Sequence, residues 1–221
     1  MSISLKSFDI FQGIEDEKLY EIQSRSRLRL IRRTEVLRYA FDDQHAYFLV
    51  SGLLKTVAMN KNGEQLVKEF LSPGSFIGEL PLIETQEREE SIAIAIEPST
   101  VIAIHLTFIR QALLDSEKFR IRIKRHIAEK MYALEDRLLD VIYKNAEERV
   151  IDLLVQLLKR FGQPSGACLR MTKFITDTDI CQYVATSRQT VSQIMNDLRQ
   201  KGMVSYTSTH LEVPLSSPLL L

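Results

Sequence analysis

Polar side chains near the C-terminal end of the chain are of the types that read nucleic acid. They recur at the spacing of one helix face: Arg188, Gln189, Ser192, Gln193 and Asn196. The donors and acceptors of these residue types match base edges and phosphate oxygens. A solvated helix more usually mixes Glu with Lys, but Asp197 is the only carboxylate between residues 188 and 200. The pattern predicts a helix that contacts DNA, and a surface for protein contacts is the alternative.

The opposite side of this segment is apolar. Its residues follow the i, i+3, i+4, i+7 pattern of a buried stripe: Val191, Ile194, Met195 and Leu198. We expect this stripe to hold the helix to the body of a small domain, so that the polar side faces outward. Gly202 is predicted to end the helix.

Neighbouring segments complete the pattern of a winged helix-turn-helix. Residues 176–179, Thr-Asp-Thr-Asp, have the N-capping chemistry of a first helix. Ala185-Thr186 is predicted as the break, and Thr186 with Gln189 as the capping box of the second helix. A terminal hairpin, the wing, is predicted between residues 203 and 213. This arrangement lays the second helix in the major groove of DNA.

A long helix is predicted between residues 108 and 144, with an apolar stripe that needs a partner. The stripe residues are spaced 4, 3, 4, 3, as in the seam of a coiled coil: Ile127, Met131, Leu134, Leu138 and Val141. Because nothing similar occurs elsewhere in the chain, a second copy of the same helix is the favoured partner. Packing of the stripe on the chain's own β domain is the alternative, and both can hold in part.

The segment from about residue 20 to residue 107 has the pattern of short strands separated by turns. Asn62-Gly63 is a strong hairpin signal, and Ser72–Ser75 and Glu97–Ser99 mark further turns. Turn signals about every 10 residues predict an antiparallel barrel, roll or sandwich. The Arg-rich stretch 25–33 is interpreted as the solvated face of an early strand rather than as a nucleic-acid patch.

The composition is that of a globular protein and gives no global sign of a partner. Apolar residues make up 45% and charged residues 26% of the 221 residues, and 29 basic side chains balance 29 acidic ones. A prediction of DNA binding therefore depends on local pattern. Cys168 and Cys181 are too few for a disulfide framework, a four-ligand metal site or an iron–sulfur cluster. We expect a cytoplasmic protein without an export signal or a membrane-spanning segment.

The sequence has no pattern typical of an enzyme. It contains no nucleophile–base pairing, no metal-ligand spacing and no phosphate-binding loop of the Walker type. The histidines are interpreted as surface or core residues rather than haem ligands: His45, His105, His126 and His210. We therefore predict no catalytic residue and no metal site.

Two groups of motifs resemble the cyclic-AMP receptor protein/Fnr (Crp/Fnr) family of bacterial transcription regulators. Residues 178–198, TDICQYVATSRQTVSQIMNDL, resemble the DNA-binding signature of that family. Residues 47–52 (YFLVSG), Asn62-Gly63 and residues 73–80 (PGSFIGEL) resemble its β-roll. The resemblance covers about residues 8 to 214 in the family's order of β-roll, dimer helix and winged helix. It implies a homodimeric transcription factor that is gated by an effector.

By this resemblance, Arg188, Gln189 and Gln193 are the recognition residues. The full set predicted to contact DNA is Thr178, Ser187, Arg188, Gln189, Thr190, Ser192, Gln193 and Asn196. Gln189 stands where Glu is common, and Gln193 stands where the cyclic-AMP receptor protein has Arg. Because Gln pairs best with adenine whereas Glu accepts from cytosine, we expect half-sites that tolerate or prefer A·T at one position. Ala185 replaces a common turn glycine, which costs about 1 kcal/mol if the turn needs a positive φ.

The resemblance also implies an effector site in the β-roll. Its predicted residues, with two positions of the long helix, are Gly78, Glu79, Leu80, Arg88, Glu89, Leu134 and Glu135. In the family's cassette the Glu accepts from a ribose hydroxyl and the Arg pairs with the cyclic phosphate. Here Glu89-Glu90 follows Arg88, and each carboxylate near a phosphate costs about 1–4 kcal/mol. No cofactor is certain: cyclic AMP is disfavoured, and another small effector or no effector are the alternatives.

The predicted fold class is α+β, with an N-terminal antiparallel β-roll of the jelly-roll type that is similar to cyclic-nucleotide-binding domains, a long dimerisation helix and a C-terminal winged helix-turn-helix. We expect domain boundaries at residues 1–115, 116–144 and 145–221. The predicted function is sequence-specific transcription regulation at a palindromic DNA site. A signalling module whose winged helix contacts protein is the alternative. The predicted partners are double-stranded DNA and a second copy of the chain, with RNA polymerase as a further candidate and no membrane.

Overall fold

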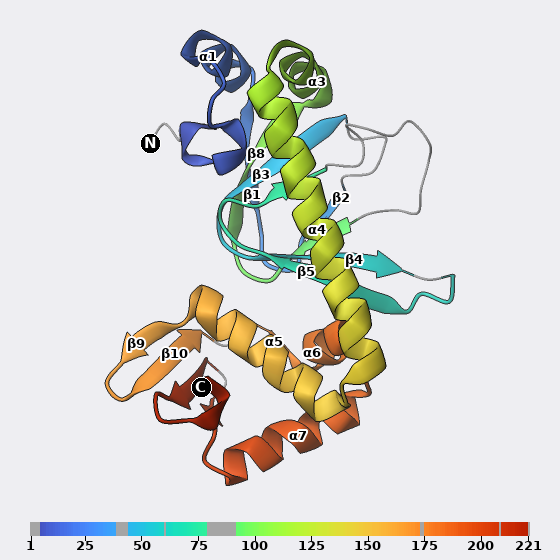
Figure 1. Ribbon diagram of the computed structural model, residues 1–221, viewed down its shortest axis with the longest axis vertical. Coiled ribbons are helices and arrows are strands. Elements are labelled where there is room, and N and C mark those ends of the chain that lie inside the picture. Colours follow the sequence, from blue (N-terminus) through green and yellow to red (C-terminus); the bar gives the residue numbers. More distant parts are fainter. Residues whose placement is uncertain are drawn as a thin grey trace. The chain divides into compact units, whose positions relative to one another are not determined.

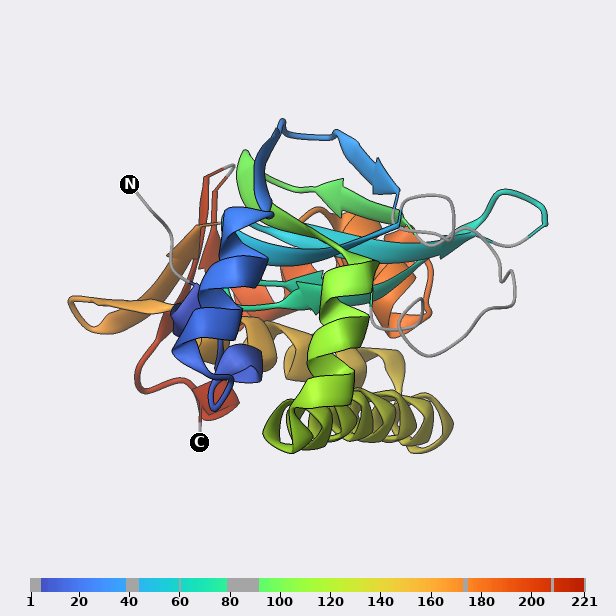
Figure 2. The same ribbon diagram turned by 90° about the horizontal axis from the view of Figure 1, so that it is seen from above.

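The computed structural model describes residues 5–38, 44–59, 61–78, 92–172, 175–207 and 209–220. The chain divides into two compact units, Met1–Leu134 and Glu135–Leu221, which Figures 1 and 2 show from two directions. Helix α4 (Glu117–Tyr143) is continuous and contributes residues to both units.

The first unit is built on two antiparallel sheets. Its described strands are β1 (Arg27–Ile31), β2 (Val36–Arg38), β3 (His45–Ser51), β4 (Leu54–Met59), β5 (Gln65–Leu71), β6 (Phe76–Ile77), β7 (Ile92–Ala95) and β8 (Ser99–His105). One sheet has the order β1-β8-β3-β6, and the other has the order β2-β7-β4-β5. Because the chain passes repeatedly between the sheets, the connectivity is that of a jelly-roll type of β-roll, which confirms the predicted fold class.

Side chains that alternate along β3 face two different apolar layers. Leu49 lies in the layer between the sheets, with Leu54 and Val101. Phe48 faces the other way and is packed among helices, with its ring centroid 4.7 Å from that of Phe11. The strand is therefore buried on both faces, as its unbroken apolar run requires.

Short helices cover the outer face of the β1-β8-β3-β6 sheet. They are η1 (Leu5–Ser7), η2 (Asp9–Phe11), α1 (Asp16–Ser24), α3 (Leu106–Asp115) and the start of α4. The sequence analysis does not predict α1. It also predicts one helix where α3 and α4 are separated by Ser116, whose backbone is extended and whose Oγ accepts from the Phe119 N–H at 3.3 Å. A serine N-cap, rather than proline or glycine, makes this break.

The first four residues of strand β1 are exposed on both faces, and only its last residue, Ile31, is buried. Arg27 and Arg29 are exposed, as the sequence predicts for this stretch. Leu28 and Leu30, which alternate with them, are 57% and 77% exposed as well. Because β1 is at the end of its sheet and the helical layer covers only the neighbouring strands, period-two alternation here does not mark a buried face.

The apolar stripe of α4 divides into two parts. Phe119 and Ile123 are buried in the helical layer, and Ile127 is half-buried against the same layer. The later stripe residues are between 42% and 66% exposed: Met131, Leu134, Leu138 and Val141. Packing on the chain's own β domain thus accounts for Ile127 but not for the rest of the stripe.

The second unit is a winged helix-turn-helix with a four-stranded sheet. Its described elements are α5 (Ala146–Phe161), β9 (Gln163–Ser165), β10 (Cys168–Thr172), α6 (Asp177–Val184), α7 (Arg188–Gln200), β11 (Ser205–Tyr206), β12 (His210–Pro214) and η3 (Pro218–Leu220). The sheet order is β11-β12-β10-β9. The hairpin of β9 and β10 is not predicted from the sequence, and it provides the strand on which the wing strand β12 pairs.

Replacing Phe119 by Ala should destabilise the first unit. The Phe119 ring is fully buried and stacks on Phe11 at 5.6 Å, so its loss leaves a cavity and costs about 3–5 kcal/mol of unfolding free energy. Because the chain has no tryptophan, urea unfolding followed by circular dichroism is the suitable measurement. Lys124→Ala, at an exposed position of the same helix, should stay within about 0.5 kcal/mol of the wild type. Equal effects of the two substitutions would contradict the packing described here.

Candidate nucleic-acid interface

Helix α7 has an apolar side that is buried and a polar side that is exposed. Its buried residues are those of the predicted stripe: Val191, Ile194, Met195 and Leu198. Most of the residues predicted to contact DNA are exposed: Thr178, Ser187, Arg188, Gln189, Ser192, Gln193 and Asn196. Thr190 is half-buried. All of these residues lie on α7 or at its N-cap, except Thr178, which lies on α6. Their contacts with DNA stay a prediction.

The second helix begins one residue later than the sequence predicts. Its N-cap is Ser187, whose Oγ accepts from the Thr190 N–H at 3.0 Å and lies 2.7 Å from the Thr190 Oγ1. The predicted capping box of Thr186 and Gln189 is wrong, because the Thr186 N–H donates to the Cys181 carbonyl and so belongs to the end of the preceding helix. The side chain of Gln189 consequently has no capping bond to make and is exposed.

Helix α6 begins with a reciprocal capping box. The Thr176 Oγ1 accepts from the Asp179 N–H at 3.1 Å, and the Asp179 carboxylate accepts from the Thr176 N–H at 2.9 Å. The same carboxylate accepts from the Thr176 hydroxyl at 2.8 Å. The predicted N-capping chemistry is thus present, and it makes Thr178 an exposed residue of the first turn. Cys181 follows in this helix, and burial raises the pKa of its thiol.

The turn between α6 and α7 places Ala185 in the left-handed region, with φ 54° and ψ 59°. The turn therefore requires a positive φ at Ala185, and the steric cost predicted for an alanine at this position applies. An alanine pays a steric cost here that glycine would avoid, since its Cβ approaches the following carbonyl oxygen.

Two arginines from outside the motif bind the end of α6. Arg137 of α4 donates from Nη2 to the Tyr183 carbonyl at 2.6 Å, and its guanidinium lies over the Tyr183 ring at 4.3 Å. Arg149 of α5 donates from Nε to the Val184 carbonyl at 2.8 Å. Neither residue is predicted from the sequence, because no local pattern relates Arg137 or Arg149 to α6.

The wing contacts helix α7 through Tyr206. Its hydroxyl donates to the Asn196 Oδ1 at 3.3 Å, and the Arg199 guanidinium lies 5.6 Å from the centre of its ring. The turn of the wing is closed by the Thr207 N–H, which donates to the His210 carbonyl at 2.9 Å. Tyr206 therefore orients a residue of the predicted DNA-contacting set, although the sequence analysis assigns it no role.

The predicted effector residues fall largely outside the described part of the chain. Glu79, Leu80, Arg88 and Glu89 are not among the described residues. Gly78 directly follows β6 with a φ of 102°, and a Cβ there would lie 3.4 Å from the Ala46 Cα. On α4, the two predicted positions are both exposed: Leu134 and Glu135.

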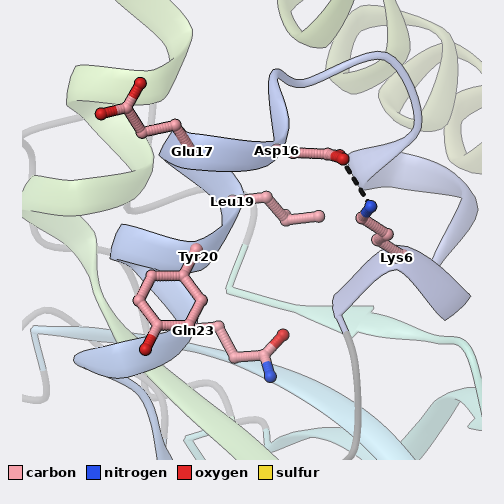
Figure 3. A pocket seen from close by; sticks show the side chains of 6 residues that line it. All are labelled: Lys6, Asp16, Glu17, Leu19, Tyr20 and Gln23. Carbon is pink, nitrogen blue, oxygen red and sulfur yellow. Dashed lines mark ion pairs between the residues drawn. The ribbon is translucent and has the colours of Figure 1, made fainter.

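A separate surface pocket lies between η1 and α1 of the first unit (Figure 3). Lys6 and Asp16 form an ion pair of 2.7 Å at one side of it. The remaining lining residues are Glu17, Leu19, Tyr20 and Gln23. None of these belongs to the residues predicted to bind an effector or DNA.

The described residues contain neither a cluster suited to a metal ion nor a helix suited to spanning a membrane. Within ranges 5–38, 44–59, 61–78, 92–172, 175–207 and 209–220, histidine, cysteine and carboxylate side chains nowhere gather in a group of three that could hold a metal ion. Among the helices in those ranges, none has both the length and the apolar character needed to cross a membrane.

Each of the two units matches a known domain family. A family model for the cyclic nucleotide-binding domain matches residues 28–116, and one for the Crp-like helix-turn-helix domain matches residues 148–214. The chain belongs to the Crp/Fnr family. The two matches together span more than half of the chain and follow the predicted order of the units.

Crp/Fnr proteins of known name are similar to this chain over most of its length. The CRP-like cAMP-activated global transcriptional regulator of Mycobacterium tuberculosis is 25% identical over 88% of this chain and 87% of its own. The cyclic AMP receptor protein of Thermus thermophilus is 26% identical over 95% of this chain and 94% of its own. The solved structure of FixK2 from Bradyrhizobium japonicum has a TM-score of 0.75 at 19% identity, covering 88% of this chain and 95% of its own.

These relatives confirm the predicted class of function. The chain is a transcription regulator of the Crp/Fnr type with a DNA-binding helix-turn-helix. The alternative, a winged helix used only for protein contacts, is not favoured. Regulators of this family bind DNA and act as dimers, and the family is one of regulators rather than enzymes.

Replacing Ala185 by Gly should stabilise the second unit. Glycine removes a left-handed strain of about 1–2 kcal/mol and loses about 0.5–1 kcal/mol through greater freedom of the unfolded chain, so a net gain of about 0–1.5 kcal/mol is expected. Differential scanning calorimetry gives the change in melting temperature. Ala185→Val is the matched opposite, because a β-branched side chain tolerates a positive φ poorly, and it should lower the melting temperature. A glycine variant that melts below the wild type would refute the assigned turn geometry.

Proposed function

We propose that the chain binds a palindromic DNA site as a homodimer and reads the bases of each half-site with Arg188, Gln189 and Gln193. The observation that carries this proposal is the two-sided character of α7. Its aliphatic side is buried, so its exposed side presents amides, hydroxyls and a guanidinium together. Such groups match the donor and acceptor pattern of base pairs in the major groove.

The supporting residues have different tasks in this proposal. Ser187 and Thr190 are engaged in the N-cap, where the Thr190 N–H donates to the Ser187 Oγ, so their proposed role is to hold the first turn of α7 in place. The Asn196 Oδ1 accepts one hydrogen bond from Tyr206 and keeps a second lone pair. Its amide can therefore both donate and accept at a base edge, or donate to a phosphate oxygen. Thr178 and Ser192 complete the proposed surface.

Dimerisation is proposed to occur through the exposed part of the α4 stripe. Its residues form the second half of the coiled-coil spacing: Met131, Leu134, Leu138 and Val141. An apolar patch of this kind is uncommon on a monomeric protein, and pairing with the same stripe of a second copy would cover it. Ile127 is already half-buried in its own unit and would lie at the edge of such an interface.

Regulation is proposed to enter through the β-roll. The match to cyclic nucleotide-binding domains supports an effector site that contains Gly78, Glu79, Leu80, Arg88 and Glu89, with Leu134 and Glu135 from α4. The acidic pair Glu89-Glu90 disfavours a cyclic phosphate beside Arg88. A regulator of this kind would act in the cytoplasm, where its DNA is, and would affect RNA polymerase either by direct contact or by occupying the promoter.

Changing Gln189 should alter which bases are preferred. Selection from random-sequence DNA with the wild-type protein should return a palindrome with A·T at one half-site position. Gln189→Glu should shift that position towards C·G, with a change in relative affinity of about 10-fold or more, because Glu accepts from the cytosine amino group. Arg188→Ala should weaken binding to the selected palindrome by about 1–3 kcal/mol and relax the base preference at the position that Arg188 reads. An unchanged preference in Gln189→Glu would refute its role in reading bases.

Leu138→Glu should convert the dimer into a monomer. The substitution places two carboxylates in an apolar interface and should weaken self-association by about 100-fold or more. Sedimentation velocity at micromolar protein concentration measures the oligomeric state. Asp136→Ala lies on the same helix but outside the stripe, and it should leave the dimer intact. A Leu138→Glu protein that still sediments as a dimer would exclude this interface.

A further inference from the structure

Three consecutive carbonyl groups at the C-terminal end of α6 are bound by two arginine side chains. Arg137 Nη2 donates to the Tyr183 oxygen at 2.6 Å, and Arg149 Nε donates to the Val184 oxygen at 2.8 Å. Arg149 Nη2 reaches the Ala185 oxygen at 3.4 Å, and its Nη1 donates to the Lys144 oxygen at 2.6 Å. The end of α6 is thereby joined to the end of α4 and the start of α5.

These contacts are of the strong kind. The last carbonyl groups of a helix have no partner within it and carry the negative end of the helix dipole, so a guanidinium there satisfies both requirements. Arg137 also lies over the aromatic ring of Tyr183, and burial lowers the pKa of its guanidinium. A charged donor with reduced access to water forms a stronger hydrogen bond than one on an open surface.

The corner between α4 and α5 is itself held by charge. Lys144 forms ion pairs with Asp140 at 2.6 Å and with Asp152 at 2.7 Å, and these two partners raise its pKa. Asn145 then begins α5 with a capping box to Glu148. Arg137 thus fixes the end of α6 to α4. Arg149, which belongs to α5, binds both the end of α6 and the Lys144 carbonyl at the corner.

We infer that Arg137 determines which spacing of DNA half-sites the protein accepts. The inference rests on the proposed function, in which α4 pairs with α4 of a second copy. In that dimer, the distance and angle between the two α7 helices depend on how α6, and through Ala185 also α7, is fixed to α4. Two recognition helices must lie about one DNA turn apart, roughly 34 Å, to enter both half-sites. A fixed link selects one spacing, whereas a loosened link accepts several.

The test compares binding of wild type and Arg137→Ala to a set of duplexes. The set contains the palindrome recovered by selection with the wild-type protein, the same palindrome with one or two base pairs added or removed at its centre, and one isolated half-site. The wild type should lose about 10-fold or more in affinity on each altered spacing. Arg137→Ala should bind the best palindrome about 10-fold more weakly, should differ by less than about 3-fold between spacings, and should keep its affinity for the half-site.

Two further variants make the result specific. Arg125→Ala removes an exposed arginine of the same helix and should keep the spacing preference of the wild type. Arg137→Lys keeps the charge but loses the planar group that lies over Tyr183, and it should give an intermediate preference; it also provides the measurement if the alanine variant does not fold.

The measured affinities distinguish a failure of this inference from a failure of the proposed function. If Arg137→Ala keeps the wild-type ratio between spacings, or loses affinity equally for every duplex including the half-site, the inference is wrong and the proposed function stands. If the wild type binds the half-site as tightly as the palindrome, the dimeric function fails and the inference fails with it.

Discussion

The burial of one side of α7 is the constraint on which the rest of the second unit depends. Val191 and Leu198 are fully buried and lie about two helical turns apart, so the helix cannot rotate about its axis without exposing them. Removing such a side chain from water contributes about 1.5–3 kcal/mol. Several of these contributions together fix which side of the helix is buried. The polar side is therefore exposed as a consequence of packing, and its chemistry is available to a partner without any rearrangement.

The ends of the helices fix what packing leaves free. A buried stripe sets the rotation of a helix, but its position along the axis and its angle to neighbours depend on the first and last turns. Here Ser187 begins α7, the left-handed Ala185 sets the angle from α6, and Arg137 and Arg149 bind the carbonyl groups that end α6. The strain at Ala185 is tolerated because residues on both sides of it are held by hydrogen bonds. The end of α6 is thus attached to α4 by the Arg137 side chain as well as by the backbone.

Sequence patterns predicted the parts of this fold that depend on local periodicity. The buried stripe of α7, the capping of α6 and the antiparallel β-roll follow from residues close in the chain. The patterns failed where a distant partner decides the outcome. The arginines of the stretch 25–33 are exposed as expected, but nothing in its local pattern indicates that Leu28 and Leu30 are exposed too, at the end of a sheet and beyond the covering helices. The predicted capping box at Thr186 is wrong because Ser187, which has the same side-chain chemistry one residue later, is the N-cap in the folded chain. Arg137, Arg149 and Tyr206 act through carbonyl or side-chain partners that only the folded chain brings near.

The balance of charge gives the proposed pairing of two copies a physical reason in DNA binding. With 29 basic and 29 acidic side chains, the chain has no overall attraction to a polyanion, and the exposed side of α7 adds mainly neutral amides and hydroxyls around Arg188. Each phosphate contact contributes through the release of counterions, so a surface with few cations gains little from this source. Neutral groups discriminate between bases, at about 1–3 kcal/mol for a good pair, but they add little affinity of their own. Joining two such surfaces turns the second binding event into an intramolecular one, with an effective concentration that depends on how well the linkage matches the site. The more neutral the recognition surface is, the more its affinity depends on the geometry that connects the two copies.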